Sequence, residues 1–197
     1  MIRRKTPGTD GLPVEFYATY INLLAPKLVA LYGAAREARI LPVSTREALV
    51  VPILKPGKDA KDPTAYRPLS MLNMDYKILS RILATRLLPF MPKLIHPDQT
   101  GFIPGRSTAV NIRRLLMQMD SDNYNAETTA VLAVDIKKAF DSLEWRFLYQ
   151  VMERMNLGVR FGAWTALLYT DPSALVRTGR LISDKYSVER GTRQGCP

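Results

Sequence analysis

The apolar positions of this chain recur with two different periods, and each period predicts a kind of secondary structure. Spacings of three and four residues are typical of helices that bury one face, and they occur over residues 14–40, 74–94 and 108–119. We expect Pro26 to split or kink the first helix, because proline cannot donate a backbone hydrogen bond. The same spacing, interrupted near Gly158, predicts two further helices over residues 143–155 and 161–169.

Short runs rich in β-branched residues predict strands between these helices. They lie at residues 48–54 and 131–136, and a hairpin around Gly179 is expected from residues 174–178 and 186–189. Segments dense in proline, glycine and polar residues predict loops at 5–13, 59–67 and 96–107. Because helices and strands alternate irregularly and no linker divides the chain, we expect a mixed α+β fold and not a doubly wound parallel sheet.

Composition and charge narrow the classes of function. Apolar residues make up 47% of the 197, which is enough for a buried core. Lys and Arg number 28 against 18 Asp and Glu, and the net charge of +10 favours a polyanionic partner, nucleic acid before an acidic membrane surface. The single cysteine and single histidine exclude an internal disulfide, a zinc cluster and a His-rich metal site. Neither a transmembrane stretch nor a secretory signal is found, so we expect a soluble intracellular protein, with nucleus and cytoplasm both open.

Two aspartates close together invite different interpretations. Asp135 follows four apolar residues, VLAV, and burial of an ionised carboxylate is costly without a partner. That partner is either a neighbouring Lys or Arg or a divalent cation such as Mg²⁺, which carboxylate oxygens prefer to bind. Asp141 instead opens DSLE before a helical pattern, and an Asp with Glu three residues later predicts a capping box worth about 1 kcal/mol.

Longer motifs resemble those of a known family. VDIKKAFDSLEW resembles the first catalytic motif of reverse transcriptases, and RGTRQGCP resembles their second. PILKPGKDAKDPTAYRPLSMLNMDYKILSRILATRL is similar to their fingers region, while HPDQTGFIPGRST and KTPGTDGLPVEFY are similar to segments of non-LTR, LINE-type retrotransposon polymerases. Group II intron polymerases share the plan, but FIPGRST and NMDYKILSRILATRL fit the LINE type better. The resemblance runs in order over nearly the whole chain.

The resemblance implies a right-hand polymerase fold with fingers, a truncated palm and no thumb. The fingers would occupy roughly residues 1–105 and 143–190, and the palm roughly 106–142 and 191–197. The implied activity is RNA-directed DNA synthesis, in which two Mg²⁺ ions assist nucleotidyl transfer to a primer 3′-hydroxyl. The implied partners are an RNA template, a DNA primer and deoxynucleotide triphosphates; the oligomeric state stays open.

The resemblance also implies roles for single residues. Asp135 would bind both ions with help from the backbone carbonyl of Ile136, and the Phe140 ring would exclude the 2′-hydroxyl of a ribonucleotide, although core packing is the commoner role of Phe. The remaining residues with an implied contact to the triphosphate are Lys55 and Arg67, to the new base pair Gln194 and Gly195, and to the template Gln99, Gly101, Phe102 and Arg106. Without the resemblance, the lysine fits a solvated basic loop and Gly195 fits a turn.

One part of the family pattern is missing. The next motif supplies an Asp-Asp pair, and no two aspartates are adjacent in the 197 residues. We therefore expect that this polypeptide as written does not polymerise, that the strand at 131–136 lacks a neighbour, and that the fingers are better ordered than the palm. A non-catalytic RNA-binding remnant and a relic reading frame without selected activity are the alternatives.

Overall fold

The computed structural model describes residues 6–121 and 130–196, which belong to two compact units. The first unit combines Met1–Leu83 with Lys138–Pro197, and the second is Ala84–Lys137. Helices and strands occur together, so the predicted mixed α+β class is confirmed. The expected division into fingers and palm stays a prediction. No helix among the described residues is both long and apolar enough to span a membrane.

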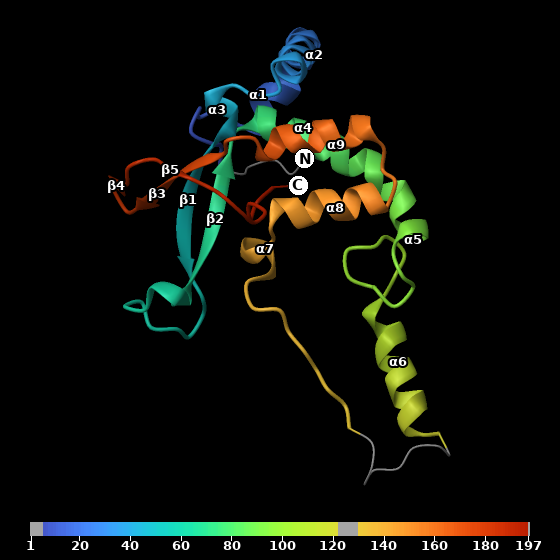
Figure 1. Cartoon of the computed structure of the whole chain (residues 1–197). Coiled ribbons are helices and arrows are strands. Elements are labelled where there is room, and N and C mark those ends of the chain that lie inside the picture. Colours follow the sequence, from blue (N-terminus) through green and yellow to red (C-terminus); the bar gives the residue numbers. More distant parts are fainter. Residues whose placement is uncertain (1–5, 122–129, 197) are drawn as a thin grey trace. The chain divides into compact units, whose positions relative to one another are not determined.

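A mixed sheet forms the framework of the first unit (Figure 1). Its strands are β1 (Glu47–Leu54), β2 (Tyr66–Leu72), β3 (Ser173–Thr178), β4 (Leu181–Ile182) and β5 (Tyr186–Ser187). The order is β2-β1-β3-β4, with β5 also paired to β3. β1 runs antiparallel to β2 and parallel to β3, so that Ala48 has Leu72 on one side and Ala174 on the other. The strand predicted at 48–54 and the predicted hairpin are both present.

β2 is a strand that the sequence pattern did not predict. Its sequence YRPLSML mixes proline, arginine and serine with apolar residues, so the alternation is weak. Pro68 is tolerated because β2 lies at the edge of the sheet order, and it pairs directly with Pro52 of β1. Neither proline can donate to the ladder, so the two share one position without an orphaned donor.

Helices of the first unit begin and end close to the predicted positions. They are α1 (Val14–Thr19), α2 (Ile21–Ala38), α3 (Val43–Arg46), η1 (Pro63–Ala65), α4 (Met74–Leu87), α7 (Ala139–Ser142), α8 (Trp145–Arg154) and α9 (Val159–Tyr169). The expected split at Pro26 is wrong: Pro26 lies inside α2, and the break occurs at Tyr20. Pro26 is in the second turn and exposed, so its missing donor removes only one hydrogen bond, to Asn22, and the helix continues.

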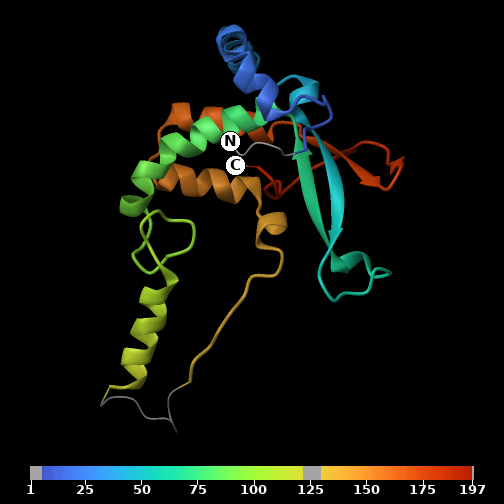
Figure 2. The ribbon, with the colours of Figure 1, turned by 180° about the vertical axis from the view of Figure 1, so that it is seen from behind.

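The core of the first unit lies where α2, α4 and α9 meet the sheet. α4 and α9 lie side by side in both views of the ribbon (Figures 1 and 2). Two tyrosine hydroxyls join the helices, Tyr32 donating to the Asp75 carbonyl at 2.8 Å and Tyr76 to the Leu168 carbonyl at 3.2 Å. The buried cluster consists of Tyr32, Ala35, Leu41, Ala48, Leu72, Tyr76, Leu79, Leu83, Leu167 and Ala174.

The second unit contains the end of α4, a proline-rich connection and one long helix. The helix predicted over 74–94 is interrupted by η2 (Leu88–Phe90) and resumes as α5 (Met91–Leu94), because Pro89 and Pro92 interrupt the helical hydrogen bonds. A loop over 95–107 follows, which is one residue longer than the predicted 96–107. α6 (Thr108–Met119) then matches its predicted range, with the Ser107 hydroxyl accepting from Ala109 N at 3.3 Å.

The strand predicted over 131–136 is absent. These residues adopt no regular secondary structure and are all exposed; Leu132 is 86% and Val134 78% exposed. A β-strand is stable only when its backbone pairs with another strand, and none pairs with this segment in the part of the chain that the structure describes. The apolar run therefore predicted the local preference but not the pairing that a strand requires.

Candidate active site

Three segments that the motif resemblance links to nucleotide chemistry meet in the first unit. The segment 191–196 lies between the edge strand β2 and the short helix α7. On one side Ser70 N donates to the Gln194 carbonyl at 2.8 Å, and on the other Thr192 N donates to the Phe140 carbonyl at 2.7 Å. A further bond of 2.7 Å joins Gly191 N to the Leu143 carbonyl. These backbone bonds fix Phe140 and Gln194 in one substructure together with the strand that carries Arg67.

Two glycines make this close packing possible. Gly191 has φ +84°, and a Cβ there would lie 2.9 Å from the carbonyl oxygens of Phe140 and Asp141. Gly195 has φ +110°, and its Cβ would lie 2.7 Å from the Ser70 carbonyl oxygen. Both positions therefore require glycine for backbone conformation and for space. For Gly195, the close neighbour in this structure is β2.

The predicted capping role of Asp141 is wrong. Asp141 lies inside α7, and the next helix begins only at Trp145 with Glu144 as its N-cap, whose side chain forms no capping bond. Two extended residues, 143 and 144, separate the helices, so the carboxylate is too early in the chain to cap α8. Asp141 Oδ1 instead accepts a hydrogen bond from Gln194 Nε2 at 3.3 Å. Sequence analysis missed this link between the two motifs.

A cavity of about 350 Å³ opens beside this contact. It is lined by Asp141, Gln194, Pro68, Ser70, Ala174 and Arg190, among others. The volume lies within the range of small-ligand sites. Phe140 lies next to Asp141 in the chain and is 54% exposed, so the alternative of ordinary core packing does not describe it.

Arg193 anchors the same segment to the sheet. Its Nη2 donates to the Arg46 carbonyl at 2.5 Å and to the Ser173 carbonyl at 3.4 Å, and its guanidinium lies 5.3 Å from the centre of the Tyr76 ring. Burial lowers the pKa of Arg193, and the nearby Tyr76 opposes that shift. The sequence showed Arg193 only as part of the RQG motif, because its acceptors are backbone carbonyls that are far away in the chain.

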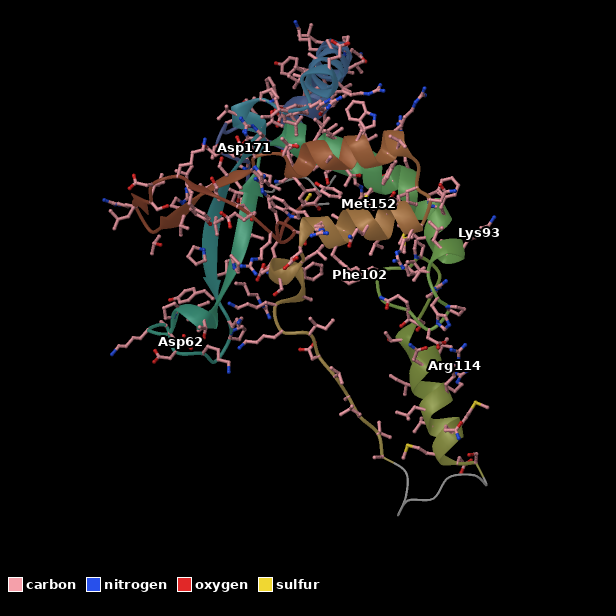
Figure 3. All side chains as sticks on the ribbon, viewed as in Figure 1. Asp62, Lys93, Phe102, Arg114, Met152 and Asp171 are labelled. Carbon is pink, nitrogen blue, oxygen red and sulfur yellow. The ribbon has the colours of Figure 1, made fainter. Side chains whose placement is uncertain are left out.

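The two basic residues that are expected to contact the triphosphate, Lys55 and Arg67, differ in their surroundings. Lys55 Nζ donates to the Thr64 carbonyl at 3.0 Å within the turn between β1 and β2. Asp62 in this turn, labelled in Figure 3, accepts from both the amide and the hydroxyl of Thr64 at 2.8 Å, and these bonds lower the pKa of Asp62. Arg67 is exposed on β2, and no hydrogen bond or ion pair joins its side chain to another described residue.

In the second unit, Arg106 organises the loop over 95–107. Its Nη1 donates to the carbonyls of His96 at 2.6 Å and Gln99 at 2.9 Å, and its Nη2 donates to those of Pro92 at 2.8 Å and Ile95 at 3.0 Å. Guanidinium has five N–H groups, so these bonds leave one donor, at Nε. The implied template contact of Arg106 stays a prediction, and its observed role is to hold the loop.

The same loop presents Phe102 to the solvent (Figure 3). Phe102 has φ +62°, which is uncommon for a residue other than glycine. Its side chain is 90% exposed. Gln99 is exposed as well, and its Nε2 donates to the Gly101 carbonyl at 3.3 Å. Arg114 of α6 pairs with Asp98, so the helix and the loop are connected. Of the template residues predicted from sequence, Phe102 is the one whose side chain is displayed most openly.

The residues of the described chain do not assemble a metal site. Asp135 is exposed in the irregular segment of the second unit and forms no ion pair with any described residue. Among residues 6–121 and 130–196, no group of three or more His, Cys, Asp or Glu side chains could hold a metal ion. An ion pair between Asp135 and a Lys or Arg, the first alternative, is therefore not observed. For the second alternative, a bound divalent cation, the described residues offer the carboxylate of Asp135 without a cluster of further acidic ligands.

Comparison with known proteins decides the family. The family described as reverse transcriptase (RNA-dependent DNA polymerase) matches residues 53–197. The chain belongs to the reverse transcriptase family. The resemblance noted in the sequence is thereby confirmed, and divalent metals, nucleic acid and nucleotides are general requirements of this family.

The relatives of this reverse transcriptase chain are proteins of retrotransposons. It is 30% identical over 197 residues to the Transposon TX1 uncharacterized 149 kDa protein of Xenopus laevis, covering 100% of this chain and 15% of that protein. It is 29% identical over 196 residues to a probable RNA-directed DNA polymerase from transposon BS of Drosophila melanogaster, covering 98% and 21%. It is 27% identical over 192 residues to a retrovirus-related Pol polyprotein from type-1 retrotransposable element R2 of Popillia japonica, covering 97% and 26%. The chain thus spans between 15% and 26% of the length of these relatives.

Proposed function

We propose that this chain supplies the nucleotide-facing and template-facing surfaces of an RNA-directed DNA polymerase of the non-LTR retrotransposon type. The observation that supports this most strongly is the segment 191–196, which is hydrogen-bonded to β2 on one side and to α7 on the other. Through it, the part of the first motif that contains Phe140, the second motif with Gln194 and the strand with Arg67 belong to one compact unit.

Each nucleotide-facing residue has a chemical reason for its role. Arg67 is exposed on β2 and forms no hydrogen bond or ion pair with another residue that the structure describes, and a guanidinium binds phosphate through two parallel hydrogen bonds. Lys55 adds charge from the adjacent turn. The half-exposed ring of Phe140 gives a flat apolar surface for the sugar, and a 2′-hydroxyl there would lose its solvation without gaining a partner. Gln194 and Gly195 would lie against the new base pair.

The template-facing residues belong to the loop of the second unit. Phe102 offers an exposed ring on which any base can stack, and such stacking tolerates all sequences. Arg106 fixes the backbone that carries Phe102, and Gln99 and Gly101 complete the same turn. We propose that this loop holds the RNA template by stacking, with phosphate charge adding affinity.

The reaction proposed for the complete enzyme is nucleotidyl transfer. The primer 3′-oxygen forms a bond to the α-phosphorus, the bond to the bridging oxygen breaks, pyrophosphate leaves and the hydroxyl proton passes to solvent. Mg²⁺, when bound, neutralises phosphate charge in such reactions, and Asp135 with the Ile136 carbonyl are its proposed ligands. Because the described residues hold no carboxylate cluster and the sequence has no Asp-Asp pair, we propose that the polypeptide alone does not perform this step.

Two measurements on the full chain test the proposal. The first is primer extension on an RNA template with Mg²⁺ and all four deoxynucleotides, in which we expect no product; elongation would contradict the proposed inactivity. The second is binding of a fluorescent deoxynucleotide triphosphate in the presence of primer and template. Arg67→Gln should weaken this binding about tenfold, whereas Arg146→Gln, which removes another exposed charge, on α8, should leave it unchanged.

A second candidate is a non-catalytic RNA-binding remnant. The absence of a metal-binding cluster among the described residues and the open display of Phe102 favour it. Under this alternative the chain would bind RNA in a salt-sensitive way, and the triphosphate would not bind at any Mg²⁺ concentration. Triphosphate binding that depends on Mg²⁺ and is lost in Asp135→Ala would reject this candidate in favour of the polymerase.

A further inference from the structure

The side chains of Asp141 and Trp145 hold the segment 191–196 at two points. Asp141 Oδ1 accepts from Nε2 of Gln194 at 3.3 Å. The indole Nε1 of Trp145 donates to the Gly191 carbonyl at 2.9 Å, three residues before the glutamine. Asp141 belongs to α7 and Trp145 is the first residue of α8, so two side chains from one short stretch of the chain act on the same segment.

Trp145 fixes the beginning of this segment. While its indole bonds the Gly191 carbonyl, the amide of Gly191 donates to the Leu143 carbonyl at 2.7 Å. Both polar groups of this glycine are therefore bonded to the residues around the start of α8. The Trp145 ring also lies 5.5 Å from the Tyr169 ring of α9, measured between ring centres. Because the ring is packed and its nitrogen can only donate, the indole offers Gly191 one fixed donor.

Asp141 fixes the direction in which the Gln194 amide points. A carboxylate has only acceptor oxygens, whereas the amide has a donor end, Nε2, and an acceptor end, Oε1. The contact is favourable when Nε2 faces Asp141, because a reversed amide would set two acceptors against each other. Both residues line the cavity of about 350 Å³. Oε1 and the second Nε2 hydrogen of Gln194 form no bond to another described residue, so they remain for a ligand.

A glutamine that is already oriented makes ligand binding easier. A free Gln side chain rotates about three bonds, and immobilising such a side chain on binding lowers affinity about two- to tenfold. Asp141 removes much of this cost before a ligand arrives, since it holds the amide in place. Its negative charge has the opposite effect, because it repels a triphosphate. The sign of the change when Asp141 is replaced therefore separates orientation from simple charge.

We propose that Asp141 and Trp145 are positioning residues, which act on the nucleotide through Gln194 by fixing the amide and the backbone that carries it. This inference rests on the proposed function, in which Gln194 lies against the new base pair. It assigns a role to Asp141 that differs from helix capping and to Trp145 a role beyond packing against Tyr169.

The first test measures binding of a fluorescent deoxynucleotide triphosphate to the full chain with primer and template, beside urea unfolding of each variant. Asp141→Leu removes the acceptor and should weaken binding about fivefold without moving the urea midpoint. Asp141→Asn keeps an acceptor oxygen and should restore the affinity to within twofold. The control Glu144→Gln removes a charge from an exposed neighbour whose side chain forms no capping bond, and it should not weaken binding. Trp145→Phe keeps a ring, loses the donor and should weaken binding about threefold.

The second test needs no nucleotide. In the ¹⁵N-labelled full chain, the side-chain amide signal of Gln194 is assigned by its loss in Gln194→Glu, and its hydrogen exchange is then measured. Exchange should be several-fold faster in Asp141→Leu, because the Nε2 hydrogen loses its acceptor. The Gly191 backbone amide should exchange faster in Trp145→Phe. Trp164→Phe, which changes the other tryptophan, should leave both rates as they are.

The outcomes separate this inference from the proposed function. Nucleotide binding by Asp141→Leu that equals or exceeds that of the unchanged chain would make Asp141 only a charge beside the cavity, and the inference would be wrong. Equal losses of affinity in Asp141→Leu and Asp141→Asn, in proportion to a lower urea midpoint, would show a purely structural role and overturn it as well. If the unchanged chain does not bind the triphosphate, the proposed function fails, whereas the exchange rates still decide whether Asp141 orients Gln194.

Discussion

Asn73 gives the sharpest test of how the first unit is held together. It is only 1% exposed and lies between β2 and α4. Its Nδ2 donates to the Ser44 carbonyl at 2.8 Å, while its Oδ1 accepts from the Thr9 hydroxyl and from Asp10 N, each at 3.3 Å. One side chain thus attaches the N-terminal turn and the segment before β1 to the core. We predict that Asn73→Ala destabilises this unit.

The expected magnitude follows from these three bonds. A typical intramolecular hydrogen bond contributes about 1 kcal/mol net, and the two bonds at 3.3 Å are long enough to contribute less. Ser44, Thr9 and Asp10 are exposed, so water can replace part of what is lost. The free energy of unfolding should therefore fall by about 2 kcal/mol, which is roughly a thirtyfold change in the unfolding equilibrium. For a chain of this size that corresponds to a drop of about 4–8 °C in Tm.

Urea unfolding followed by tryptophan fluorescence measures this change. Both tryptophans, Trp145 and Trp164, belong to the same unit as Asn73, so the signal reports on the affected part. Asn22→Ala, on the exposed surface of α2, is the matched control and should shift the unfolding free energy by less than about 0.5 kcal/mol. Hydrogen exchange should also become faster at Asp10, whose amide loses its acceptor.

If Asn73→Ala unfolds at the urea concentration of the unchanged chain and Asp10 exchanges at its original rate, the three bonds carry no net stability. A loss as large as that of Asn73→Ala in the Asn22 control would likewise show that the effect is not specific to the buried amide.

Three further predictions concern other parts of the chain. Gly195→Ala should lower the unfolding free energy by about 1–3 kcal/mol, because φ is +110° and the new Cβ meets the Ser70 carbonyl, whereas Gly162→Ala in α9 has open space and should not destabilise. Arg106→Gln should make the loop over 95–107 a site of rapid proteolysis, because four carbonyls lose their donor, while Arg113→Gln should leave the cleavage pattern unchanged. Burial raises the pKa of the Asp75 carboxyl, so the folded state binds this proton more tightly than the unfolded state. The free energy of unfolding should therefore rise as the pH falls through the folded-state pKa of Asp75. Urea midpoints at several pH values should show this rise in the unchanged chain and not in Asp75→Asn.

The sequence predicted those elements that depend on local pattern. The range of α6 and the strand at 48–54 follow directly from hydrophobic spacing, and the predicted C-terminal hairpin contains Gly179 with positive φ. β2 was missed because proline, arginine and serine in YRPLSML weaken the alternation of apolar and polar residues. The strand at 131–136 was wrongly predicted, since spacing reports preference and not the presence of a pairing partner.

The candidate site was predicted less completely. Motif resemblance identified Phe140 and Gln194, but it could not show that Asp141 bonds to Gln194 and does not cap a helix. Arg193 and Arg106 act on backbone carbonyls, which every residue possesses, so no sequence pattern marks their partners. Interactions of this kind become visible only when the path of the chain is known.

The parallel pairing of β1 with β3 has a consequence for how the protein is made. Ser173 pairs with Glu47, and the whole of Ala84–Lys137 is synthesised between them. A ribosome therefore releases β1 and β2 long before the third strand emerges, and during that interval one edge of β1 stays bare to other nascent chains. Closure of so large a loop is entropically slow, so the sheet is completed only after Ser173–Thr178 has been synthesised, and until then this edge is open to pairing with another chain.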